Sequence, residues 1–140
     1  MSALDIYDRI TIEALTLDNL HVWDGVHELD GCPTIGLAES HSLGVAWKAA
    51  RLNEYVIGAY AYIDDEDTRW IVCLCRVDDI EGTVATHKMF WDAKLDAAHN
   101  NLLHVGVEQT PSHWLIASLE DEGFRLTSQT WKKSTRRARP

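Results

Sequence analysis

The sequence of 140 residues contains no apolar run near the roughly 20 residues that span a bilayer. Its first residues lack the basic and apolar regions of a secretory signal. Three cysteines are too few and odd in number for a framework of disulfides, and three prolines and the lack of any repeat exclude collagen-like chains. We therefore expect a cytoplasmic protein with reduced thiols and no membrane association.

Several site motifs are also missing. The seven histidines form no His-x-x-x-His or Glu-x-x-His pair, and Cys73 and Cys75 have no second cysteine pair to complete a zinc site. Buried packing is the usual role of such cysteines. No Gly-x-x-x-x-Gly-Lys motif and no Ser-His-Asp order occur either. We therefore expect no metal site and no nucleotide-hydrolysing loop.

Charge is unevenly distributed along the chain. All 22 acidic residues and 8 of the 13 basic residues lie in residues 1–131, whereas the other five basic residues lie in residues 132–140. We expect one domain over residues 1–131, followed by a solvated basic tail over residues 132–140. An acidic body repels phosphate backbones, so nucleic acid is not an expected partner of the fold.

Hydrophobic periodicity predicts a mixed fold. Period-two runs predict strands, and apolar residues at spacings of three and four predict helices. A turn is expected at Asn53 and Glu54 and another in the acidic run 64–67, while residues 28–41 read as a loop with at most a short helical turn. The expected strands are 10–14, 43–52, 55–63, 69–77, 102–107 and 124–131, and the expected helices are 17–26, 83–100 and 111–122. This order predicts an α/β (α+β) domain, with a mostly antiparallel sheet of about six strands flanked by about three to four helices.

The order of elements, together with particular segments, resembles the GNAT N-acetyltransferase superfamily over residues 8–131. ITIEALTLDNLHVW is similar to the family's first strand and helix, and VAWKAARLNEYVIGAYAYI to its second and third strands. LLHVGVEQTPSHWLIASLEDEGFRL is similar to the fifth strand, the following helix and the terminal Gly-Phe, here Gly123 and Phe124. The chain is also similar to small divergent members of the family that bacteriophages encode.

The resemblance implies an acetyl-CoA site between strands 69–77 and 102–107. The pyrophosphate of the cofactor would bind backbone N–H groups at the start of the next helix, where unpaired amides and the helix dipole stabilise an anion. Carried over position by position, the implied cofactor-binding residues are Arg76, Val77, Gly82, Thr83, Val84, Ala85 and Ser112. Ser112 is equally well interpreted as an ordinary helix N-cap.

The phosphate-binding loop departs from the family pattern Gln/Arg-x-x-Gly-x-Gly/Ala. The matching segment is DIEGTV, in which only Gly82 fits, and Asp78, Asp79 and Glu81 place three carboxylates beside it. Like charges about 4 Å apart repel by about 1 kcal/mol in water, so this loop disfavours pyrophosphate. His87 and Lys88 are expected to offset part of the repulsion. A plain turn at Gly82 is an equally weighted interpretation.

The catalytic groups of the family are also only partly matched. Leu119 occupies the position at which many members have a tyrosine that protonates the departing thiolate. For removing a proton from the acceptor amine, Glu108 is the first candidate and His104 the second, because both lie beside the implied cleft. Each has a structural alternative, a solvated strand end for Glu108 and a core-edge imidazole for His104, and we rank that alternative first.

Two hypotheses follow, with a third ranked last. The first is an N-acyltransferase that moves an acetyl group from acetyl-CoA to an amine of a small molecule or protein, acting as a monomer or homodimer. The second is a catalytically silent GNAT-fold protein, of the kind a phage directs at a host enzyme, that binds a partner protein through exposed tryptophans. The third is a nucleic-acid accessory that works through the basic tail.

Overall fold

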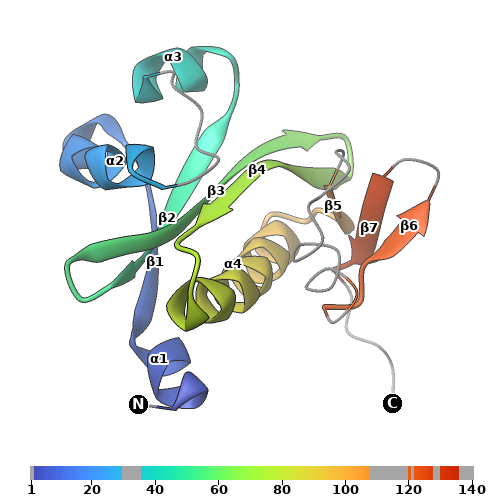
Figure 1. The fold of residues 1–140 in the computed structure, drawn as a ribbon. Helices are drawn as coiled ribbons and strands as arrows, with labels where there is room; N and C mark the ends of the chain where they lie inside the picture. The colour runs from blue at the N-terminus through green and yellow to red at the C-terminus, as the bar shows by residue number, and fades with distance from the viewer. Residues whose placement is uncertain (1, 30–35, 108–119, 121, 128–129, 136–140) are drawn as a thin grey trace.

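A computed structural model describes residues 2–29, 36–107, 120, 122–127 and 130–135 of the chain (Figure 1). The regular elements follow in the order α1 (Ala3–Arg9), β1 (Ile10–Ala14), the 3-10 helix η1 (Leu17–Asn19), α2 (Leu20–His27), α3 (Leu37–Ser42), β2 (Ala46–Leu52), β3 (Tyr55–Asp65), β4 (Thr68–Arg76), α4 (Ile80–His99), β5 (His104–Val107), β6 (Arg125–Thr127) and β7 (Thr130–Ser134).

The strands form a seven-stranded sheet in the order β1-β2-β3-β4-β5-β7-β6. Every neighbouring pair is antiparallel except β4 and β5, which are parallel. The predicted α/β class with a mostly antiparallel sheet is therefore confirmed. The strand count is one higher than expected, because the strand predicted over residues 124–131 is a hairpin of β6 and β7.

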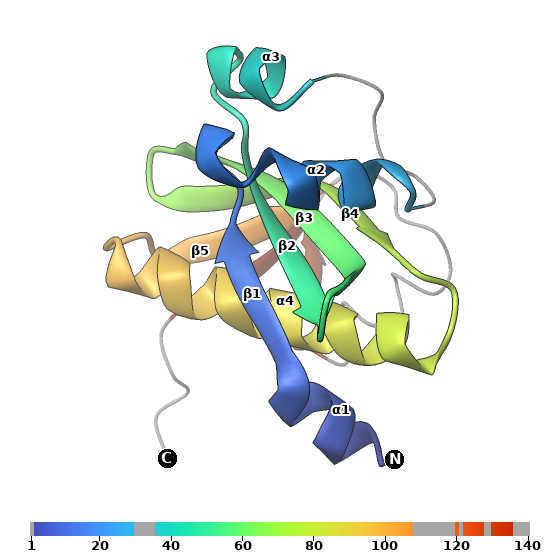
Figure 2. The same cartoon turned by 90° about the vertical axis from the view of Figure 1, so that its left-hand side faces the viewer.

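Helices cover both faces of the sheet (Figures 1 and 2). On one face α4 packs over the sheet beside α1, and the apolar core beneath includes Tyr60, Met89 and Phe90. On the other face α2 packs over β3, and a second core includes Trp23 and Trp47, whose rings meet edge to face with centroids 5.0 Å apart. The sheet is thus the middle layer of three.

The N-terminal helix α1 was not predicted. It begins with a capping box in which the Ser2 hydroxyl accepts from the Asp5 amide while the Asp5 carboxylate accepts from the Ser2 amide. Ile6 is buried in the α4-side core. Lys88 Nζ donates to the carbonyl of Tyr7 at 2.6 Å, which fixes α1 against α4.

The two predicted turns are present, with one adjustment. Asn53, at the β2–β3 turn, has φ of 57°, a left-handed conformation that asparagine tolerates. The acidic run does not lie entirely in a turn, because β3 continues through Asp64 and Asp65. Only Glu66 (φ 54°) and Asp67 connect β3 to β4. The acidic run therefore comprises the end of β3 and the two-residue turn of a long hairpin.

Two helical boundaries differ from the prediction. Residues 37–42, at the end of the segment expected to be a loop with at most a short helical turn, form the six-residue helix α3, and Trp47 Nε1 donates to Ser40 Oγ at 2.8 Å in the core beneath it. The long helix α4 begins at Ile80 rather than at Thr83, because Asp79 is its N-cap. Aspartate is among the preferred N-cap residues, and Glu81 in the first turn complements the helix dipole.

The C-terminal part is described only in pieces. Most of the helix predicted over residues 111–122 lies outside the described residues. β7 continues to Ser134, so Lys132 and Lys133 are strand residues paired with β5. Thr135 then donates its amide to the Leu103 carbonyl and its hydroxyl to the Leu102 carbonyl.

Candidate functional site

The described pairing of the parallel strands β4 and β5 covers the first part of β4. Their register runs from Thr68 opposite His104 to Ile71 opposite Val107. β4 continues for five more residues, 72–76, paired with β3 on its other side. Within the described residues, the pairing of β4 with β5 extends to Ile71 and Val107. The backbone of a strand can also bind an extended ligand that contains amide groups.

A β-bulge lies at the point where this pairing ends. On β3, Tyr62 is opposite Ile71 and Ala61 is opposite Cys73, so Val72 is an extra residue in β4. A bulge bends its strand and increases the local twist. The bulge at Val72 directly follows the residues of β4 that pair with the described part of β5.

The turn between β4 and α4 is tightly packed. A Cβ on Gly82 would lie 1.8 Å from the Val77 carbonyl oxygen, so only glycine allows the first turn of α4 to approach the end of β4. Arg76 Nη1 donates to Thr83 Oγ1 at 2.8 Å, and Thr83 Oγ1 donates to the Asp79 carbonyl at 3.2 Å. The packing against Val77 accounts for Gly82 without a ligand.

The N-terminus of α4 is capped by its own sequence. Asp79 Oδ1 accepts from the Gly82 amide at 3.0 Å, and the Asp79 carbonyl accepts from the Thr83 amide. The Gly82 amide is one of the first-turn donors that the resemblance assigns to a phosphate. In this structure a carboxylate already satisfies that donor.

The other residues implied for the cofactor have different surroundings. Val84 and Ala85 are buried in the α4-side core, so their side chains pack against the sheet. Ser112 and Glu108 lie outside the described residues. His87 and Lys88 do not face the acidic loop, because His87 Nδ1 pairs with Glu122 Oε1 at 2.6 Å and Lys88 binds the Tyr7 carbonyl.

His104 lies at the closed end of the parallel pair. It is the first residue of β5, opposite Thr68, three residues before the point where the described pairing ends. Its side chain is 38% exposed, and Nε2 lies 4.0 Å from Asp67 Oδ2. At about 3.3 Å per residue, His104 is about 10 Å along the strand from Val107.

Two cysteines follow the bulge on β4. Cys75 is buried, and its thiol lies 3.7 Å from the Ala59 carbonyl oxygen, whereas Cys73 is only partly buried. A hydrogen bond from the Cys75 thiol lowers the pKa of Cys73, against the opposing effect of burial. Both side chains pack toward the α2-side core, as their predicted packing role requires.

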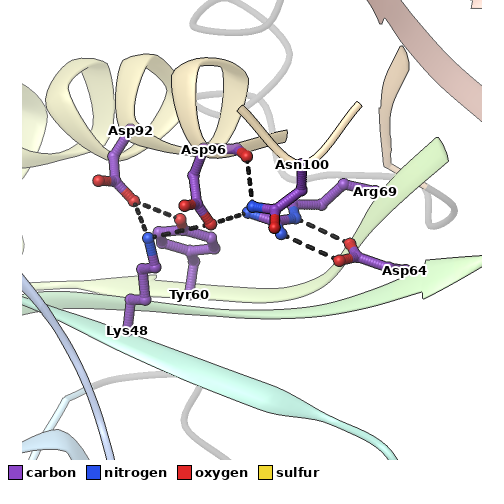
Figure 3. A network of polar contacts seen from close by, with 7 residues as sticks. All are labelled: Lys48, Tyr60, Asp64, Arg69, Asp92, Asp96 and Asn100. Atoms are coloured by element: carbon purple, nitrogen blue, oxygen red, sulfur yellow. Dashed lines mark hydrogen bonds and ion pairs between the residues drawn. The ribbon is translucent and has the colours of Figure 1, made fainter. Parts of the chain in front are cut away.

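A polar network holds the C-terminal half of α4 to the sheet (Figure 3). Arg69 is almost fully buried, donates to both carboxylate oxygens of Asp64 and pairs with Asp96. Its guanidinium also stacks over the Tyr62 ring at 3.9 Å. Lys48 Nζ lies 3.0 Å from Asp92 Oδ2 and 3.3 Å from Asp96 Oδ2.

Titration of the network follows its contacts. Burial alone would raise the pKa of Asp96, but the hydrogen bond from Arg69 and the charge of Lys48 outweigh it and lower that pKa. The Tyr60 hydroxyl donates to Asp92 Oδ2 at 2.6 Å, and burial together with the Asp92 charge raises the pKa of Tyr60. The network therefore favours protonated Tyr60 and ionised Asp96.

A cavity of about 300 Å³ opens between α2, the β2–β3 turn and Val77. Arg51 on its wall donates to Glu13 at 2.9 Å, and its buried Nε has no hydrogen-bond partner among the residues that the structure describes. Glu28 and Glu54 also line this cavity. Val77 is six residues beyond Ile71, so the cavity lies about 20 Å along β4 from the end of the parallel pairing.

The site as described only partly fits acetyl-CoA. The backbone of a strand such as β4 can hydrogen-bond an extended, amide-containing arm. The first turn of α4 does not suit a phosphate in this arrangement, because Asp79 occupies the Gly82 amide and Asp78 and Glu81 add negative charge. An anion could use the Gly82 amide only after the Asp79 side chain had moved.

Some of these features had a sequence signal and others did not. Asp79, three residues before Gly82, carries an ordinary N-cap signal that the comparison with the family loop obscured. The bulge at Val72 had none, because residues 69–77 are largely apolar on both faces. Among the described residues, no group of three His, Cys, Asp or Glu side chains is arranged to bind a metal, and none of the described helices is long and apolar enough to cross a membrane.

Comparisons with known proteins give a clear result for the fold. No family model matches the chain, and no curated protein sequence does. A GNAT family acetyltransferase from Elizabethkingia anophelis with acetyl-CoA bound matches with a TM-score of 0.69 and 20% identity over 86% of this chain and 79% of that one. The ribosomal-protein-S18-alanine N-acetyltransferase from Escherichia coli matches with a TM-score of 0.71 and 11% identity over 92% and 96% of the two chains.

A third solved structure, the IAA acetyltransferase from Bacillus cereus, matches with a TM-score of 0.67 and 18% identity over 85% of this chain and 79% of that one. At these identities the likeness concerns the backbone arrangement. The parallel β4–β5 pair within an otherwise antiparallel sheet, together with these matches, establishes that the chain has the fold of the GNAT acetyltransferases.

Proposed function

We propose that this protein is an N-acyltransferase that uses acetyl-CoA as its acyl donor and an amine as its acceptor. The observation that carries the proposal is the sheet, in which β4 and β5 form the one parallel pair of described strands and β4 has a bulge at Val72. The fold of the chain is also that of an acetyltransferase solved with acetyl-CoA bound.

The residues of this chain would divide the binding of the donor between them. The backbone of residues 72–76 would hydrogen-bond the pantetheine arm as an added strand does. The Gly82 amide, at the start of α4, would bind the phosphates once the Asp79 side chain has moved, with Arg76 and Thr83 beside it. The donor supplies an acetyl thioester, whose carbonyl carbon is open to attack by an amine.

The acceptor amine must lose a proton before it can attack. Glu108 directly follows Val107, the last residue of β5, and remains our first proposal for the base. His104 is the second, although its contact is with Asp67 at the closed end of the strand pair. Departure of the thiolate has no tyrosine donor at position 119, so we propose protonation by water.

One observation favours the alternative of a silent binding protein. The acidic first turn of α4 is already capped, and the outer surface of that helix exposes Trp91 and Leu95. These two residues line a cavity of about 250 Å³ with Tyr7 of α1 and Ile12 of β1. In this alternative, a partner protein would bind the exposed aromatic surface and the donor site would be vestigial.

Calorimetric titration with acetyl-CoA tests the donor part of the proposal. We expect saturable binding at millimolar concentration or below, a matching rise in melting temperature, and no response to NADH, which has a pyrophosphate but no pantetheine arm. Absence of binding up to a few millimolar acetyl-CoA, in the wild type and in Asp79→Asn, would contradict the proposal. If the wild type then binds a partner protein and Trp91→Ala abolishes that binding, the result would support the alternative.

A further inference from the structure

The carboxylate of Asp79 lies where an external anion would bind α4. Its Oδ1 accepts from the Gly82 amide at 3.0 Å, with the Asp79 backbone extended at φ −155° and ψ −171°. An amide hydrogen makes one good hydrogen bond, so the Gly82 amide cannot serve Asp79 and a phosphate oxygen at full strength together. The two anions are therefore alternative ligands of one donor.

The turn itself cannot shift to relieve this conflict. The Gly82 backbone is packed against the Val77 carbonyl so closely that a Cβ has no room, and Thr83 Oγ1 is held between Arg76 and the Asp79 carbonyl. The Asp79 side chain, by contrast, belongs to an exposed residue. Rotation of this side chain into solvent is thus the simplest way to release the amide.

We propose that Asp79 is a tethered competitor that sets the affinity of the protein for the phosphates of its acyl donor. The inference rests on the proposed function. A carboxylate attached to the same turn has an effective concentration in the millimolar range or above, whereas the donor is free in solution. The donor must therefore displace a permanently available anion, and affinity falls accordingly.

The neighbouring Asp78 is a control that distinguishes competition by Asp79 for the Gly82 amide from general repulsion between carboxylates and phosphate. Asp78 and Asp79 carry the same charge, are adjacent, and are both exposed, but within the described residues the Gly82 contact is made by Asp79. Removing either charge weakens the repulsion of a phosphate, which salt screens at exposed positions. Replacing the Asp79 carboxylate by a neutral cap also replaces the charged acceptor of the Gly82 amide by a weaker one.

The test compares Asp79→Asn and Asp79→Ser with Asp78→Asn. Asparagine and serine are both good N-cap residues, so helix α4 keeps a cap in either variant. Their neutral oxygen accepts from the Gly82 amide less strongly than a carboxylate, so a phosphate displaces it more easily. Each protein is titrated calorimetrically with acetyl-CoA and, separately, with S-acetylpantetheine, which carries the same thioester arm but no phosphate. Melting temperatures and circular dichroism establish that the variants fold like the wild type.

We expect the two Asp79 variants to bind acetyl-CoA about tenfold more tightly than the wild type, the effect of one charge-assisted hydrogen bond. Asp78→Asn should change this affinity less than threefold, and no variant should change the affinity for S-acetylpantetheine. Equal effects of Asp79→Asn and Asp78→Asn, or unchanged affinity in both Asp79 variants, would overturn the inference while leaving the proposed function intact. Failure of every variant to bind acetyl-CoA would remove both.

Discussion

Lys48 on β2 and Asp92 on α4, 44 residues apart in the sequence, form an ion pair with Nζ 3.0 Å from Oδ2. Both side chains are largely shielded, at 12% and 26% exposed. Lys48 also reaches Asp96, which binds Arg69. Lys48 thus connects β2 to two successive turns of α4, and Arg69 connects the second of these turns to β4.

Lys48→Met should destabilise the protein by roughly 2–3 kcal/mol, because it leaves Asp92 and Asp96 partly shielded without one of their cations. Urea unfolding followed by circular dichroism measures the change. Lys94→Met is the matched control, since Lys94 has its Nζ 5.0 Å from the Trp91 ring, at the exposed surface of the same helix. Its effect should stay below about 1 kcal/mol, and equal losses in the two variants would contradict a stabilising network.

Acid should unfold the protein partly through Asp96. The pKa of Asp96 is lower in the folded state than its ordinary value of 3.8, so its contribution to stability is present above that value and lost as pH falls toward the folded pKa. The free energy of unfolding, measured in urea from pH 7 to pH 3, should therefore decline from about pH 5 downward. In Asp96→Asn this decline should be shallower; an identical slope would exclude Asp96 from the acid response.

Gly82→Ala should be strongly destabilising. The added Cβ would meet the Val77 carbonyl oxygen at 1.8 Å, and neither backbone segment can yield without breaking the turn. We expect a loss of about 2–3 kcal/mol in urea unfolding, the upper range for overpacking. Gly36→Ala is the control, because a Cβ at that position has no atom within 4 Å, and it should be neutral within about 0.5 kcal/mol.

Glu108→Gln should lower the kcat/KM of acetyl transfer by roughly 10²–10⁴ if Glu108 accepts the amine proton, with acetyl-CoA binding unchanged. His104→Ala should have an effect below tenfold, given its place at the closed end of β4 and β5. Steady-state assays across pH separate the two, because loss of a base removes the acidic limb of the rate profile. Full activity in Glu108→Gln would reject this residue, and a larger loss in His104→Ala would reverse the ranking.

Local signals predicted much of this fold. β1 has its expected bounds, and the left-handed conformation of Asn53 places the β2–β3 turn where the sequence indicated it. The apolar positions of α4 recur at helical spacing in one uninterrupted helix. Each of these features depends on neighbours within a few residues, which is the range over which periodicity and turn chemistry act.

Features that depend on distant partners were not predictable in this way. The division of residues 124–131 into β6 and β7, and the pairing of Lys48 with Asp92, are set by tertiary packing. At the site, the acidic residues around Gly82 were visible in the sequence, but the family pattern drew attention to phosphate binding rather than to capping. The capping contact of Asp79 is a local structural feature, and it occupies the Gly82 amide that the proposed donor site would offer to an anion.

The four residue pairs between β4 and β5 have a consequence for internal motion. They are the backbone connection, within the described residues, between the larger sheet of β1–β4 and the smaller group of β5, β7 and β6. The larger sheet has far longer ladders and both cores beneath it. Deuterium should therefore enter the amides of the smaller group first, as a separately opening cooperative unit, without any loss of order in β1–β4.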